Sequence, residues 1–240
     1  MKHIPNFITS LNLAAGFISI IFAFNGALVT ASWLILAAMI FDFLDGFFAR
    51  LLKSYSAIGK ELDSLADIVS FGVAPAILIY QLLVSSMALT YPMIFNAGSF
   101  ETNLVLLLPV LMPVCAALRL AIFNTDETQT TSFKGLPTPA NALAVISVII
   151  ADHYTNSDII SSFTGSKTAL LIFTVILSLL MVIRIPMLSL KITHLKFKGN
   201  EGRYILVVMV AVTLFIFGLG ATPLIIPLYI FVSIISLLFK

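Results

Sequence analysis

Long apolar runs separated by short polar breaks fill almost the whole chain, a pattern typical of a protein that crosses a membrane several times. A helix needs about 20 apolar residues to span the hydrocarbon core of a bilayer. Eight runs approach that length, and we expect each to be one span: 8–28, 29–52, 64–88, 103–124, 138–153, 168–189, 203–219 and 222–239. They lack the polar alternation of membrane β-strands, so they predict helices.

The composition supports the same class of protein. Of the 240 residues, 60% are hydrophobic and 10% are charged, whereas about 25% of the residues of an average soluble domain are charged. This balance excludes a disordered chain, a nucleic-acid-binding protein and an ordinary soluble enzyme. We find no linker, and we therefore predict an all-α, polytopic integral membrane bundle of about eight helices that forms one domain over residues 1–240.

Lysine and arginine are distributed very unevenly between the loops. With eight spans, both termini lie on one side of the membrane, and that side holds every Lys and Arg except Lys167, twelve of the thirteen. Loops rich in Lys and Arg remain in the cytoplasm. We therefore expect both termini to be cytoplasmic.

Acidic residues are concentrated in one short stretch. Five of the eleven lie between positions 42 and 67, namely Asp42, Asp45, Glu61, Asp63 and Asp67. An ionisable side chain inside the membrane costs about 2.5–3.5 kcal/mol on the insertion scale, and such residues are functional candidates. A solvated loop between two spans accounts for Glu61. It does not account for Asp42, which lies within an apolar run.

The spacing of the aspartates predicts one site. Asp42 and Asp45 are three residues apart and Asp63 and Asp67 are four apart, so each pair shares a helix face. The short connection between the two helices allows the pairs to converge. Four carboxylates at low dielectric require cations to remain ionised together, and Mg²⁺ or Mn²⁺ are the divalent ions that prefer oxygen ligands.

The same stretch carries a longer motif. Residues 42–67 read DFLDGFFARLLKSYSAIGKELDSLAD, which resembles the signature of the CDP-alcohol phosphotransferases, D-x2-D-G-x2-A-R-x8-G-x3-D-x3-D. Chance agreement at all eight positions has a probability on the order of 10⁻¹⁰ per starting position. The matching residues are Asp42, Asp45, Gly46, Ala49, Arg50, Gly59, Asp63 and Asp67.

The resemblance implies a role for each signature residue. Asp42, Asp45 and Asp63 would hold a pair of divalent ions, and Asp67 would share in that metal site and act as general base on the acceptor hydroxyl. The remaining positions would bind the nucleotide donor: Gly46, Ala49 and Gly59 line the cytidine pocket, Arg50 orients the acids or the diphosphate, and Asn12 on the first span touches the nucleotide. A helix cap or a helix–helix hydrogen bond explains Asn12 equally well.

Other segments resemble the bacterial and archaeal phosphatidylserine synthases of this family. They are IPNFITSLNLAAGF (4–17), SLADIVSFGVAPA (64–76), RLAIFN (119–124) and FKGLPTPANA (133–142). Ile122 replaces the second arginine of the familiar R-L-A-R-F-N motif. The resemblance implies transfer of a phosphatidyl group from CDP-diacylglycerol to L-serine, with release of CMP. It also implies a homodimer in a prokaryotic inner or plasma membrane, with the active site facing the cytoplasm and a catalytic core of about 1–190, extended by the spans at 203–239.

The acceptor site is predicted from fewer residues. Arg119 and Lys134 are positive groups that suit the serine carboxylate, and Asn124 is a hydrogen-bonding group beside them. Each has a simpler explanation: Arg119 as an interfacial residue with its charge at the membrane surface, Lys134 as an ordinary cytoplasmic charge, and Asn124 as the end of a helix.

Two other functions remain open at this level. The first keeps the donor but uses glycerol 3-phosphate or an inositol phosphate as acceptor, which would require more converging basic residues. The second is an ion-coupled transporter, which intramembrane carboxylates suggest in general. Against a transporter, the acids cluster at one surface, and we find no repeated halves with helices broken near the midplane.

Overall fold

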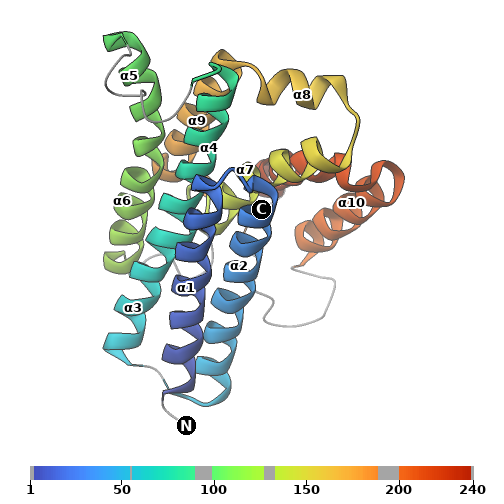
Figure 1. The fold of residues 1–240 in the computed structure, drawn as a ribbon. Coiled ribbons are helices and arrows are strands. Elements are labelled where there is room, and N and C mark those ends of the chain that lie inside the picture. The colour runs from blue at the N-terminus through green and yellow to red at the C-terminus, as the bar shows by residue number, and fades with distance from the viewer. Residues whose placement is uncertain (1–2, 55, 90–98, 127–132, 189–199, 239–240) are drawn as a thin grey trace.

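The computed structural model describes residues 3–54, 56–89, 99–126, 133–188 and 200–238, and it is helical almost throughout. Figure 1 shows α1, α2, α4, α6 and α9 standing side by side, with α10 set to one side of this group. The elements, in chain order, are α1 (Ile4–Phe24), α2 (Leu28–Leu51), α3 (Ala57–Asp67), the π-helix η1 (Ile68–Val73), α4 (Ala74–Ser86), α5 (Phe100–Leu107), the 3₁₀ helix η2 (Leu108–Val110), α6 (Leu111–Thr125), β1 (Phe133–Lys134), α7 (Thr138–Tyr154), α8 (Asp158–Thr164), α9 (Lys167–Val182), β2 (Pro186–Met187), α10 (Glu201–Phe217), the 3₁₀ helix η3 (Gly218–Leu224) and α11 (Ile225–Leu238).

The all-α membrane class is confirmed, while the number of spans remains a prediction. Within the described residues, five helical runs are long and apolar enough to cross a membrane: Ile4–Phe24, Leu28–Leu51, Ala57–Ser86, Phe100–Thr125 and Glu201–Ser236. The pair α8 and α9, bent by 79°, would make a sixth. A helix lies in each of the eight predicted segments, but α9 ends at Val182, before the end of the predicted span at 168–189, and α7 has only 17 residues. The last two segments join into one run of α10, η3 and α11.

The predicted orientation is not tested by the fold. Five of the basic residues behind it, Lys2, Lys191, Lys196, Lys198 and Lys240, lie outside the described residues. The cytoplasmic placement of both termini therefore also remains a prediction.

Small residues bring the first two helices close together. Ala23, Ala31 and Ala38 are fully buried, and small side chains allow helix backbones to approach each other in a membrane. Ser19 on α1 donates a hydrogen bond of 2.8 Å to the carbonyl of Ala31 on α2. Because the C-terminal half of α2 carries the first part of the signature, the tight packing of α1 and α2 fixes the position of Asp42 along the bundle.

Gly16 on α1 makes an equally close contact with η1. A Cβ at this position would lie 2.7 Å from the Cα of Ser70, and Ser70 Oγ donates to the carbonyl of Asn12 at 3.0 Å. No side chain larger than hydrogen fits here without moving one of the two backbones.

We therefore expect Gly16→Ala to lower the midpoint of thermal unfolding in detergent, because overpacking a close contact costs about 1–3 kcal/mol. The variant should also lose catalytic activity, since α1 carries side chains that bind the aspartates. Ala14→Val, on the exposed face of the same helix, serves as the control and should unfold like the parent. An unchanged midpoint for Gly16→Ala would contradict the tight packing.

The π-helix η1 follows Asp67 directly, and the aspartate spacing did not predict it. Short π-helical turns are frequent at functional sites. Asn141 on α7 donates to the carbonyl of Phe71 within η1 at 3.2 Å. This contact ties α7, a largely buried helix, to the turn that follows the last signature aspartate.

Candidate active site

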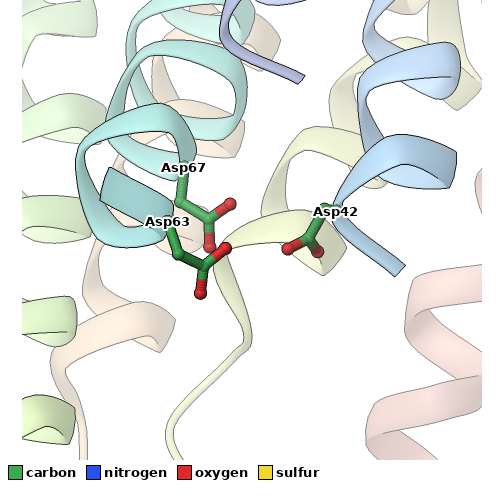
Figure 2. Close-up of side chains that lie close together, drawn as sticks. All are labelled: Asp42, Asp63 and Asp67. Carbon is green, nitrogen blue, oxygen red and sulfur yellow. The ribbon is translucent and has the colours of Figure 1, made fainter. Parts of the chain in front are cut away.

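Three aspartates from two helices form the centre of the site. One carboxylate oxygen each of Asp42, Asp63 and Asp67 lies within 4.8 Å of the others. Figure 2 shows Asp63 and Asp67 extending from one helix toward Asp42 on another, with the three carboxylates around a common space. This arrangement joins the two halves of the signature, as the spacing predicted.

The local structure explains why these side chains meet. Asp63 and Asp67 lie one turn apart on α3, and α3 packs against α1, which is paired with α2. Asn12 on α1 donates to Asp67 Oδ1 at 3.4 Å, so α1 orients the aspartate that is 8% exposed. The predicted nucleotide contact Asn12 therefore lies against Asp67.

The donor set fits a divalent cation. Asp63 Oδ1 is buried and has no hydrogen-bond partner among the described residues. A buried carboxylate oxygen without a partner is costly, and a cation between the three groups would satisfy it. Hard oxygen ligands at this spacing suit Mg²⁺ or Mn²⁺ better than softer metals.

Asp45 borders the three aspartates without being one of the group. Its Oδ2 accepts a hydrogen bond of 2.6 Å from Thr9 on α1, and its side chain is 5% exposed. Its charge acts on the neighbouring Asp42 and Asp63. The sequence predicted a metal site of four aspartates, whereas the structure places three of them together and gives Asp45 a hydrogen bond from Thr9.

A cavity of about 380 Å³ opens beside Asp45 and Asp63. The four signature residues predicted to bind the nucleotide all line it, namely Gly46, Ala49, Arg50 and Gly59. Lys60 also lines this cavity, although its place in a polar connection gave no reason to select it. The cavity thus joins a basic group, a small-residue wall and two acids of the signature.

The predicted acceptor residues separate into two groups. Arg119 and Lys134 line a second, small cavity together with Arg184 and Ile122. Lys134 also forms a salt bridge of 2.8 Å with Asp126. Asn124 does not line this cavity, since its Nδ2 donates to Ser64 Oγ on α3 at 2.8 Å.

Arg184 was missed in the sequence because it follows a long apolar run and resembles an ordinary charge at the end of a span. The structure places it with Arg119 and Lys134, so three cations surround one cavity. Ile122, which replaces a family arginine, lies at the same place. Arg184 therefore supplies a positive group where the expected one is absent.

Arg119 lines the basic cavity and also interacts electrostatically with the aspartate group. Its side chain is 7% exposed, and its charge interacts with Asp67. The aspartate group thus borders the first cavity through Asp63, and Asp67 interacts with an arginine that lines the basic cavity. Such a layout suits a reaction in which a diphosphate and an anionic acceptor meet at one metal centre.

Comparison with known proteins agrees with this arrangement. The profile described as CDP-alcohol phosphatidyltransferase matches residues 2–235. The chain belongs to the CDP-alcohol phosphatidyltransferase family.

The sequences of several relatives align with most of this chain. The CDP-diacylglycerol–serine O-phosphatidyltransferase of Helicobacter pylori (strain J99) is 33% identical over 240 residues, which cover 98% of this chain and 91% of that protein. The protein of the same name from Mycobacterium leprae is 36% identical over 194 residues, 78% of this chain and 58% of its own length. The archaetidylserine synthase of Methanothermobacter thermautotrophicus is 35% identical over 153 residues, 63% and 59% of the two chains.

Membership of the CDP-alcohol phosphatidyltransferase family confirms the resemblance that the signature indicated. Members of this family are membrane enzymes that depend on metal ions. The group of Asp42, Asp63 and Asp67 is accordingly a candidate metal site of such a transferase.

Proposed function

We propose that this protein transfers the phosphatidyl group of CDP-diacylglycerol to L-serine, forming phosphatidylserine and CMP. The carrying observation is that the aspartate group borders one cavity directly and interacts with an arginine that lines a second, basic cavity. Asp63 lines the cavity that holds the nucleotide-binding residues of the signature. Asp67 interacts with Arg119, which lines the basic cavity. The H. pylori and M. leprae relatives carry the name of this reaction.

The donor would lie with its cytidine in the larger cavity. Gly46, Ala49 and Gly59 provide a wall without bulky side chains, which allows a flat base to approach the backbone. Arg50 would pair with a phosphate oxygen. Asn12 would act indirectly, by orienting Asp67 through a hydrogen bond.

The acyl chains would occupy apolar space next to the same helices. A cavity of about 300 Å³ is lined by apolar groups of α2, α7, α10 and α11, including Met39, Leu143 and Val210. Met39 lies one helical turn before Asp42 on α2, so this space begins near the metal site. A long acyl chain therefore fits beside a diphosphate held at the aspartates.

The acceptor would bind with its carboxylate at the basic cavity, whose volume of about 10 Å³ is too small to enclose a whole serine. Arg119, Lys134 and Arg184 would bind the serine carboxylate, with Asn124 outside this contact shell. Asp67 would accept the proton of the serine hydroxyl as general base. The serine oxygen then forms a bond to the phosphorus that carries the diacylglycerol, and the bond to the bridging oxygen breaks, so that CMP leaves with the electron pair.

Two divalent ions, Mg²⁺ or Mn²⁺, would supply charge neutralisation at the diphosphate when bound. Asp42, Asp63 and Asp67 would hold them, with Asp45 as the fourth ligand once its bond to Thr9 is exchanged.

The wider predictions belong to the same proposal. The chain would form one domain over 1–240, with a core of about 1–190 and extra spans at 203–239, and would act as a homodimer. It would lie in a prokaryotic inner or plasma membrane with the site facing the cytoplasm. The excess of Lys and Arg on one side of the predicted topology supports this orientation.

CMP release by the purified protein in detergent tests the function. We expect release from CDP-diacylglycerol to require L-serine together with Mg²⁺ or Mn²⁺. L-Alanine, which has the same charged groups but no hydroxyl, is the matched control and should give none. Release with glycerol 3-phosphate or an inositol phosphate, and none with L-serine, would contradict the acceptor. No release with any acceptor from folded protein would contradict the donor.

A further inference from the structure

The C-terminal helix α11 contacts the acceptor side of the site through one buried phenol. Tyr229 is 4% exposed, and its Oη donates a hydrogen bond of 2.9 Å to the carbonyl of Leu188. Leu188 comes directly after β2. The sequence gave no reason to select Tyr229, because it lies within a continuous apolar run far from the signature.

A second hydroxyl on the same helix completes the contact. Ser233, one turn after Tyr229, accepts a hydrogen bond of 3.1 Å from the amide of Leu188 and donates to the carbonyl of Tyr229 at 2.7 Å. Both backbone polar groups of Leu188 are therefore bound by α11. A buried backbone group without a partner is costly, so this pair of bonds determines where β2 ends.

From β2, the hydrogen bonds continue to the turn that contains Lys134, the lysine on the acceptor side of the site. β2 pairs antiparallel with β1, with Lys134 opposite Pro186. The amide of Gly135 donates to the carbonyl of Ile185 at 2.8 Å. Gly135 has a φ of +80°, and a Cβ there would lie 2.9 Å from the carbonyl oxygen of Ile183, so only glycine suits this tight turn.

Tyr229 also lies close to the arginine of the basic cavity. Arg119 lies within electrostatic range of the Tyr229 hydroxyl, but a phenol is uncharged at neutral pH, so no ion pair joins the two side chains. Arg119 Nε is buried and has no hydrogen-bond partner among the described residues. Its position therefore depends on the packing of the elements around it.

We propose that Tyr229 is a positioning residue for the acceptor, acting through the Leu188 contact on the turn of Lys134, which lines the basic cavity with Arg119. This inference rests on the function proposed above, because it assigns the basic cavity to the acceptor. The C-terminal helix α11 then contributes to acceptor binding. Tyr229 does not touch the reacting atoms, so its effect falls on acceptor affinity.

Tyr229→Phe tests the inference because it removes the hydroxyl and retains the ring. We expect the KM for the acceptor to rise about tenfold, the typical effect of losing one hydrogen bond. Tyr229 also lines the apolar cavity assigned to the acyl chains, and phenylalanine retains its ring there, so the KM for CDP-diacylglycerol and kcat should change less than about twofold.

Thr222→Val is the matched control. Thr222 on η3 also uses a hydroxyl to bind the backbone of another element, donating to the carbonyl of Ser147 on α7 at 2.9 Å. Both variants lose one such bond and should lose similar thermal stability. Only Tyr229→Phe should raise the acceptor KM, and an equal effect of both would contradict a specific role.

The measurement also separates this inference from the proposed function. If the parent protein releases CMP only with a phosphorylated acceptor, the proposed function is wrong, and the KM of that acceptor is the readout for Tyr229. An unchanged acceptor KM in Tyr229→Phe contradicts the positioning role. If Tyr229→Phe does not fold, Ser233→Ala removes the second contact to Leu188 and should raise the same KM, and no change there contradicts the role as well.

Discussion

Asp67→Asn should reduce acceptor-dependent CMP release by about 10²–10⁴-fold, the usual contribution of a general base. Asparagine has nearly the same shape but cannot accept the hydroxyl proton. It can still pair with Asn12, which contacts Asp67 at 3.4 Å, so the helix packing should persist. Initial rates at saturating CDP-diacylglycerol and L-serine, measured on protein of unchanged elution volume in detergent, give the effect on kcat.

Asp158→Asn is the control for this substitution. Asp158 is an exposed aspartate in the first turn of α8, far along the chain from the signature. The same chemical change there should leave the rate within about twofold, as expected for surface substitutions. If Asp67→Asn retained more than about a tenth of the parent rate, Asp67 would not be the base, given the range for proton transfer.

The centre of the site follows from the sequence because its geometry is local. Asp63 and Asp67 occur one turn apart on a single helix, and Asp42 lies in the C-terminal half of a neighbouring helix joined by a short connection. Helical periodicity and connection length are thus enough to bring the three carboxylates together. The family resemblance, and not the periodicity, implied that Gly46 and Gly59 line one pocket, and both line the cavity beside Asp45 and Asp63.

The partners of these groups depend on packing between distant segments, which periodicity does not describe. Thr9 lies 36 residues before Asp45 in the sequence, and Arg184 and Tyr229 come from the second half of the chain. Each follows or interrupts an apolar run in the way that many membrane residues do. Their roles appear only when α1, α9 and α11 are placed against the signature helices.

The hydropathy pattern also did not predict where the helices bend or change type. The predicted span at 64–88 begins at Ala57, because the polar first turns of α3 continue the same helical run. The 79° bend between α8 and α9 and the π-helix η1 leave little trace in hydropathy. At η1 the side chain of Asn141 from another helix binds the carbonyl of Phe71, and Gly165 ends α8 at the bend.

Removing divalent cations should abolish activity and lower stability together. Loss of charge neutralisation at the diphosphate amounts to several kcal/mol, at least about 10³-fold in rate. Restored Mg²⁺ or Mn²⁺ should also raise the midpoint of thermal unfolding, because a ligand that binds only the folded state stabilises it. Chelation with EDTA followed by titration of each metal, with both rate and unfolding recorded, measures the two effects on one sample.

Asp63→Asn distinguishes a metal site from a merely acidic cluster. Asp63 Oδ1 is buried without a partner among the described residues, and the carboxylates of Asp42 and Asp67 lie beside it. In the metal-free protein these like charges repel each other, so replacing one with a neutral amide should raise the unfolding midpoint. In the presence of metal the order should reverse, because the variant loses a ligand and with it both the metal-dependent increase and the activity.

Glu101→Gln, in the exposed first turn of α5, should show neither change. A metal-dependent increase that survived in Asp63→Asn would mean that the stabilising cation binds elsewhere on the protein.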